Sequence, residues 1–111
     1  MWADEVAGHC VRQGANFFHS FPLDNIISSP IKLRGSFDGS KKKNRAAGGA
    51  CLEVLTTRGW SRWKEAGGFI PKGTVAQAEL AGARTLVLML GCLVKCSTID
   101  EMNSVESLET Q

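Results

Sequence analysis

An unbroken apolar run from Leu86 to Val94 is the strongest pattern in this chain. Thr74 and Gln77 precede it at the spacing of a capping box, in which the hydroxyl and the amide side chain each satisfy a backbone group of the first helical turn. We therefore expect a helix over residues 75–95. Because its second half is apolar on every side, that half must be buried against the chain itself, a partner or a membrane.

A second helical pattern lies near the C-terminus. Thr98 and Glu101 repeat the capping-box spacing. The apolar residues that follow the cap recur at every third position: Ile99, Met102, Val105 and Leu108. Four acidic residues and no Lys or Arg occur after position 96. We expect a short amphipathic helix that folds back onto the first one and completes a C-terminal helical hairpin.

The middle of the chain carries weaker signals. Apolar and polar residues alternate from Ile31 to Phe37, which predicts a strand with one apolar and one basic face. Asp38-Gly39 is typical of a turn, but the lysines after it offer no apolar face for a second hairpin strand. Residues 51–57 favour a strand slightly over a helix, and residues 60–66 are interpreted as one or two helical turns.

These patterns predict a single domain that is mainly α or small α+β, with a C-terminal helical hairpin and a weakly ordered N-terminal region. Residues 1–37 form the weakly ordered segment with an edge strand, residues 38–50 a flexible basic loop, and residues 51–111 a mainly helical region. The 111 residues suffice for one domain and not for two. Apolar residues at 43% and charged residues at 22% are ordinary for a folded chain.

Charge patterning supplies the first candidate site. Lys41, Lys42, Lys43 and Arg45 place four positive charges close together, and such a group can lie along phosphates and release counterions. The same pattern is also typical of a solvated loop that binds nothing. Trp60 and Trp63, spaced by three residues among basic neighbours, are interpreted either as packing anchors or as a surface for nucleic acid or anionic lipid.

Chemistry-bearing motifs are absent from the sequence. His9 and Cys10 are adjacent, which does not aim one side chain at the other, and no glycine pair forms a phosphate loop. Cys92 and Cys96 lack a second close pair of ligands for zinc. We therefore expect no enzyme, no metal, no cofactor and no small-molecule substrate.

The N-terminal residues also bear on location. They include acids and no apolar stretch, so we expect an intracellular protein with reduced cysteines. A nuclear or membrane-associated location remains the alternative.

The favoured hypothesis is a small non-enzymatic interaction protein with a protein partner of unknown identity. Its electrostatic arm is the basic loop, which addresses an anionic surface or membrane. The residues expected to form its apolar interaction surface are Leu86, Leu90, Leu93, Trp60 and Trp63. One alternative is a small membrane-associated protein with residues 75–95 in or on the bilayer. Another is a translated reading frame without a selected biochemical role, which the absence of Tyr and the 12 Gly residues also fit.

Overall fold

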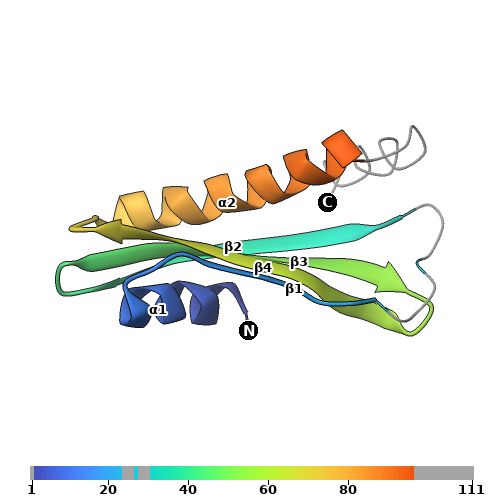
Figure 1. Cartoon of the computed structure of the whole chain (residues 1–111), viewed down its shortest axis with the longest axis horizontal. Helices are drawn as coiled ribbons and strands as arrows, with labels where there is room; N and C mark the ends of the chain where they lie inside the picture. The colour runs from blue at the N-terminus through green and yellow to red at the C-terminus, as the bar shows by residue number, and fades with distance from the viewer. Residues whose placement is uncertain (1, 24–26, 28–30, 97–111) are drawn as a thin grey trace.

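The structure of the chain is a computed structural model that describes residues 2–23, 27 and 31–96, with the backbone alone for residues 92–96. A four-stranded antiparallel sheet in the order β1-β4-β3-β2 lies between two helices. Helix α2 covers one face of the sheet and α1 covers part of the other (Figure 1). The elements in chain order are α1 (Ala3–Gln13), β1 (Phe17–Ser20), β2 (Leu33–Lys42), β3 (Arg45–Thr56), β4 (Gly59–Pro71) and α2 (Val75–Cys96).

The predicted fold class is wrong, because strands make up more of the described chain than helices do, and the two helices lie on opposite faces of one antiparallel sheet instead of forming a hairpin. Residues 60–66, expected as helical turns, belong to β4. Both tryptophans lie in β4, and this strand shifts register opposite Leu52 and Glu53. Leu52 pairs with Lys64 and Glu53 pairs with Arg62, so Trp63 is an extra residue in this strand.

The segment 38–50, expected as a flexible loop, forms the facing ends of β2 and β3. Pairing runs without a break from Asp38 with Gly49 to Lys42 with Arg45. The connection between the two strands is therefore the two-residue turn Lys43–Asn44, in which Lys43 has a positive φ of 56°. The turn predicted at Asp38-Gly39 lies within β2 instead. Sequence reasoning looked for an apolar partner strand, whereas the partner of β2 is a run of alanines and glycines.

The N-terminal region, expected to be weakly ordered apart from an edge strand, contains a helix of 11 residues and a strand. Helix α1 ends at Gly14, whose left-handed conformation is typical of a helix C-cap. Strand β1 then pairs with β4 from Phe17 opposite Gly67 to Ser20 opposite Lys64. The segment is held by tertiary contacts that its own weak sequence signals do not reveal.

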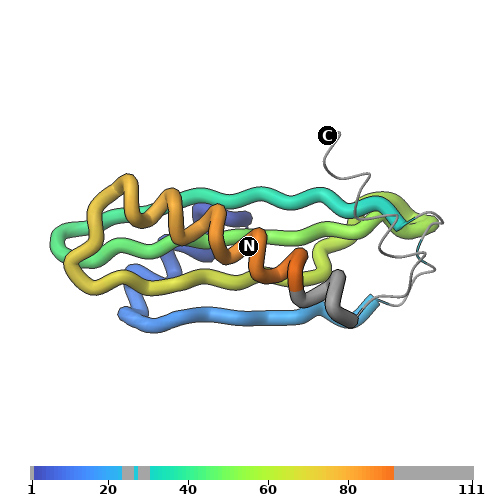
Figure 2. Tube along the Cα trace, turned by 90° about the horizontal axis from the view of Figure 1, so that it is seen from above, coloured from blue at the N-terminus to red at the C-terminus, as the bar shows by residue number. Residues whose placement is uncertain are grey.

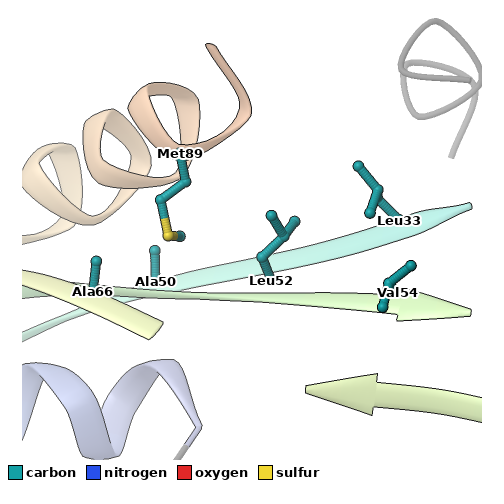
Figure 3. Close-up of a cluster of buried hydrophobic side chains, with 6 residues drawn as sticks. All are labelled: Leu33, Ala50, Leu52, Val54, Ala66 and Met89. Carbon is teal, nitrogen blue, oxygen red and sulfur yellow. The ribbon is translucent and has the colours of Figure 1, made fainter. Parts of the chain in front are cut away.

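Strand β3 is the centre of the structure, because residues 46–52 are all buried and both of its faces are covered. Ala47 and Cys51 pack against α1, whereas alternate residues face α2. The buried cluster beneath α2 consists of Leu33, Ala50, Leu52, Val54, Ala66 and Met89 (Figure 3). Viewed from above, α2 crosses the strands diagonally (Figure 2).

Helix α2 confirms the helix predicted over residues 75–95, including its cap. The Thr74 backbone N–H donates to Gln77 Oε1 at 2.8 Å, and the Gln77 N–H donates to Thr74 Oγ1 at 3.1 Å. This reciprocal pair is a capping box. The predicted second helix over residues 98–109 lies outside the described residues.

Glycines allow the helices to approach β3 backbone to backbone. A Cβ on Gly48 would overlap the backbone nitrogen of Gly82 in α2 and lie 2.6 Å from the Ala78 carbonyl oxygen. On the opposite face, a Cβ on Gly49 would lie 2.6 Å from the Ala7 nitrogen in α1. Both helices are therefore closer to the sheet than any side chain larger than hydrogen permits.

We expect Gly48→Ala to lower the free energy of unfolding by about 3 kcal/mol, because α2 must move away from the sheet. Gly68, which pairs with Gly48 on β4, is the matched control. A Cβ there would meet no atom of the described residues within 4 Å, so Gly68→Ala should change stability by less than about 1 kcal/mol. Urea unfolding of both variants measures the difference, and equal effects would contradict the close approach.

Candidate polyanion-binding site

Four cationic side chains surround a shallow hollow at one end of the sheet. The C-terminal end of α1 lies there beside the β2–β3 turn (Figure 1). The hollow has a volume of about 410 Å³ and is lined by Val11, Arg12, Lys42, Lys43, Asn44 and Arg45. Two elements far apart in the sequence thus contribute to one positively charged surface.

Arg45 joins the hairpin to α1. Its Nη1 lies 3.1 Å from the Val11 carbonyl oxygen and 3.3 Å from that of Arg12, and it donates to both. These carbonyls belong to the last turn of α1, where the helix leaves its acceptors unpaired and a positive charge is favourable. The Arg45 guanidinium carbon also lies 5.9 Å from the centre of the Phe69 ring. Arg45 is therefore a positioning residue, because it fixes the β2–β3 hairpin against the last turn of α1.

The β2–β3 turn is held from β4 as well. The Lys72 backbone N–H donates to the Asn44 carbonyl oxygen at 2.6 Å. This hydrogen bond attaches the β2–β3 turn to the residue that follows β4. The basic side chains of the turn are therefore held in position by contacts with α1 and with the end of β4, and do not belong to a flexible loop. A fixed position lowers the entropy that is lost when such side chains bind a ligand.

The predicted basic group divides between the two faces of the hairpin. Lys42 and Lys43 line the hollow together with Arg45. Lys41 is exposed and pairs with Ala46, on the face that carries α2. Arg12, which sequence reasoning missed, completes the hollow from α1. No signal in the sequence marks Arg12, because only the folded chain brings the end of α1 to the turn.

Electrostatics favour an anion in this hollow. Arg12, Lys42 and Lys43 are exposed, and none of the described residues that line the hollow carries a carboxylate. Cations that share a concave surface without a counter-charge repel one another and raise the local positive potential. An incoming phosphate relieves this repulsion.

The predicted apolar surface lies mainly against the sheet. Leu86, Leu90 and Trp63 pack on the buried cluster beneath α2, and the Leu93 side chain is outside the described residues. Trp60 is 36% exposed, with the Arg34 guanidinium carbon 4.5 Å from its ring centre. Among the described side chains of α2, the exposed large apolar residues are instead Val75, Leu80, Val87 and Leu88.

Two thiols lie buried between α1 and the sheet. Burial raises the pKa of Cys10, and desolvation raises the pKa of Cys51 to about 11 although the Arg62 charge opposes the shift. Arg62 Nη1 donates to Cys51 Sγ at 3.4 Å. Because the thiolate is the reactive form, these cysteines are poor nucleophiles at neutral pH.

Helix α2 approaches β2 closely at Gly39. A Cβ on Gly39 would lie 2.6 Å from the Glu79 backbone nitrogen, so Glu79 is next to the strand position that follows Asp38. Among the described residues, no group of three or more His, Cys, Asp or Glu side chains is arranged to hold a metal ion.

Comparison of the chain with protein-family models, with curated proteins and with solved structures returns no match. Within the described part of the chain, neither helix combines the length and the hydrophobicity that crossing a bilayer requires.

We expect Arg45→Met to lower the free energy of unfolding by about 1–2 kcal/mol, because it removes two hydrogen bonds to the end of α1 while keeping an unbranched apolar stem. Lys42→Met, at the paired position of β2, is the control and should change stability by less than about 0.5 kcal/mol. Thermal unfolding followed by circular dichroism compares the two variants. A loss as large in Lys42→Met would show that the bonds of Arg45 do not hold the hairpin to α1.

Proposed function

We propose that this chain binds the phosphodiester backbone of nucleic acids at the β2–β3 hairpin. The observation that carries the proposal is the single hollow in which Arg12, Lys42, Lys43 and Arg45 converge from α1 and the hairpin. The lysines present flexible point charges, and Arg12 adds a planar donor suited to phosphate oxygens.

The chemistry of the lining favours contact with phosphates rather than reading of bases. Apart from Val11, the lining consists of cations and one Asn, and the described residues that line the hollow include no aromatic ring on which a base would stack. Contacts to phosphate position a protein without carrying sequence information. Binding should therefore be weakly dependent on nucleotide sequence and strongly dependent on salt.

The number of available cations sets the expected salt dependence. Arg45 already donates to two carbonyl oxygens of α1, which leaves Arg12, Lys42 and Lys43 for the ligand. Three phosphate contacts on a single strand correspond to a slope of about −2 in a plot of log K against log salt.

We expect the double variant Lys42→Glu/Lys43→Glu to abolish binding of a fluorescein-labelled single-stranded oligonucleotide at low salt, as measured by fluorescence anisotropy. Lys41→Glu is the control, because it reverses one charge at the neighbouring position, on the opposite face of the hairpin. The control should weaken binding to the same extent for oligonucleotides of different sequence. It should change the slope of log K against log salt by about 1 or less.

Three outcomes would contradict the proposal. An equal loss of affinity in Lys41→Glu would show that binding depends on the net charge of the protein and not on the side chains around the hollow. Unchanged binding in the double variant would remove the hairpin from the interaction. Binding to vesicles of anionic phospholipid without binding to the oligonucleotide would assign the same cations to a membrane surface.

A further inference from the structure

Strand β2 forms one border of the sheet (Figure 2). Among the described residues, no strand pairs with its outer side. The strand is ten residues long and contains no proline, so each of its residues carries a backbone N–H. Unpaired backbone groups along such an edge form a template for a further strand. The middle of this edge is accessible, because its exposed residues include Arg34, Gly35, Phe37 and Asp38.

The pairing of β2 with β3 decides which backbone groups point outward. The Leu55 N–H donates to the Lys32 carbonyl oxygen at 2.9 Å, and these residues lie opposite each other when the register of the two strands is extended by one residue. In an antiparallel pair, hydrogen-bonded and non-hydrogen-bonded residues alternate. Even-numbered residues of β2 therefore direct their backbone groups toward β3, and odd-numbered residues direct theirs outward. The Gly39 N–H agrees with this alternation, since it donates to the exposed Asp38 carboxylate at 2.8 Å.

This alternation restricts how a second β2 can be added. Two β2 strands that pair antiparallel about a two-fold axis bring residue i of one copy opposite residue j of the other, with a constant sum of i and j. Because odd-numbered residues must pair with odd-numbered ones, that sum is even. A sum of 72 places Ser36 opposite itself on the axis and Arg34 opposite Asp38 of the second copy. A sum of 74 places Arg34 and Asp38 opposite serines instead.

The charges in the register with a sum of 72 are complementary. Arg34 and Asp38 share the face of β2 that carries α1, and they occupy non-hydrogen-bonded positions, at which opposing side chains are closest. Glu53 already accepts from Arg34 Nε at 3.1 Å. The guanidinium has two further nitrogens, which can donate to a second carboxylate. The two-fold axis forms this Arg–Asp pair twice.

The opposite face of β2 is complementary in shape in the same register. Phe37 is 51% exposed and pairs with the small Ala50 in β3. In the second copy, the residue opposite Phe37 is Gly35. A Cβ on Gly35 would lie 2.7 Å from Leu86 Cδ1, so this position has no room for a side chain of its own. An aromatic ring next to an edge glycine shields the backbone that the glycine leaves bare.

We propose that two copies of this chain pair through the outer edges of β2, with Arg34 opposite Asp38 and Ser36 on the two-fold axis. The sheets of the two copies then form one continuous antiparallel sheet. On pairing, the Asp38 carboxylate exchanges the Gly39 N–H for Arg34 of the second copy, and a backbone carbonyl of the second copy accepts that N–H. The proposal is independent of phosphate binding, because residues 33–39 do not line the basic hollow.

Charge reversal tests the proposed pairing. We expect the unsubstituted chain to form dimers as its concentration rises, as measured by sedimentation velocity. Asp38→Arg and Arg34→Asp, each alone, should raise the dissociation constant of the dimer about tenfold or more, because like charges then lie opposite each other twice. An equimolar mixture of the two variants should restore the dimer, since every arginine then faces an aspartate. Circular dichroism verifies that each variant is folded.

A disulfide tests the position of the axis. In the proposed register the two Ser36 Cα atoms are about 4.5 Å apart, which a disulfide can span. We expect Ser36→Cys to give a covalent dimer under mild oxidation, and mass spectrometry of the linked peptides locates the bond at the substituted positions. Ser40→Cys is the matched control, because Ser40 has the same partial burial on the same face of β2. The two Ser40 Cα atoms would be about 27 Å apart and should not be linked.

Several results would overturn the proposal. A chain that remains monomeric at every concentration would show that the edge does not pair with a second copy. A dimer that both charge reversals leave unchanged would place the interface elsewhere. Failure of the mixture to restore the dimer, or equal cross-linking of Ser36→Cys and Ser40→Cys, would exclude the register.

Discussion

Backbone-to-backbone contact across Gly48 and Gly49 is the constraint on which the rest of this structure depends. Neighbouring residues of a strand face opposite sides of a sheet, so two consecutive glycines admit one helix on each side. At Gly48, α2 approaches so closely that a Cβ would overlap the backbone nitrogen of Gly82, and at Gly49 the approach is to α1. The two helices are therefore held at fixed positions along β3. On the side of α1, alanines, valines and two buried thiols fill the space around these contacts.

The position of α1 creates the candidate site. Because α1 covers Gly49, its last turn ends beside the β2–β3 turn, where its carbonyl oxygens require donors. Arg45 supplies two hydrogen bonds to that turn, and Arg12 then lies with Lys42 and Lys43 around one hollow. One guanidinium thus stabilises the junction while its neighbours remain exposed to an anion. Arg45, which is bonded to α1, thus lies beside Arg12, Lys42 and Lys43, which are proposed to bind the anion.

Sequence patterns identified some elements and missed others for physical reasons. The capping box at Thr74 is local, since its bonds join residues three apart, and it is found where it was predicted. The basic group was predicted residue by residue, but its division between two faces follows from the pairing of β2 with β3. The β4 strand was mistaken for helix because its pairing with β1 and β3 joins residues far apart in the sequence. Arg12 had no local signal at all.

By itself, the sequence determined where α2 begins and that four cations cluster near position 43. These features rest on interactions within a few residues of one another. Only the tertiary structure decided that a run of alanines and glycines is the central strand. Small side chains carry little intrinsic preference for a strand, and their value lies in the space that they leave for two helices. The same packing decided which cations share a hollow and which apolar face of α2 points outward.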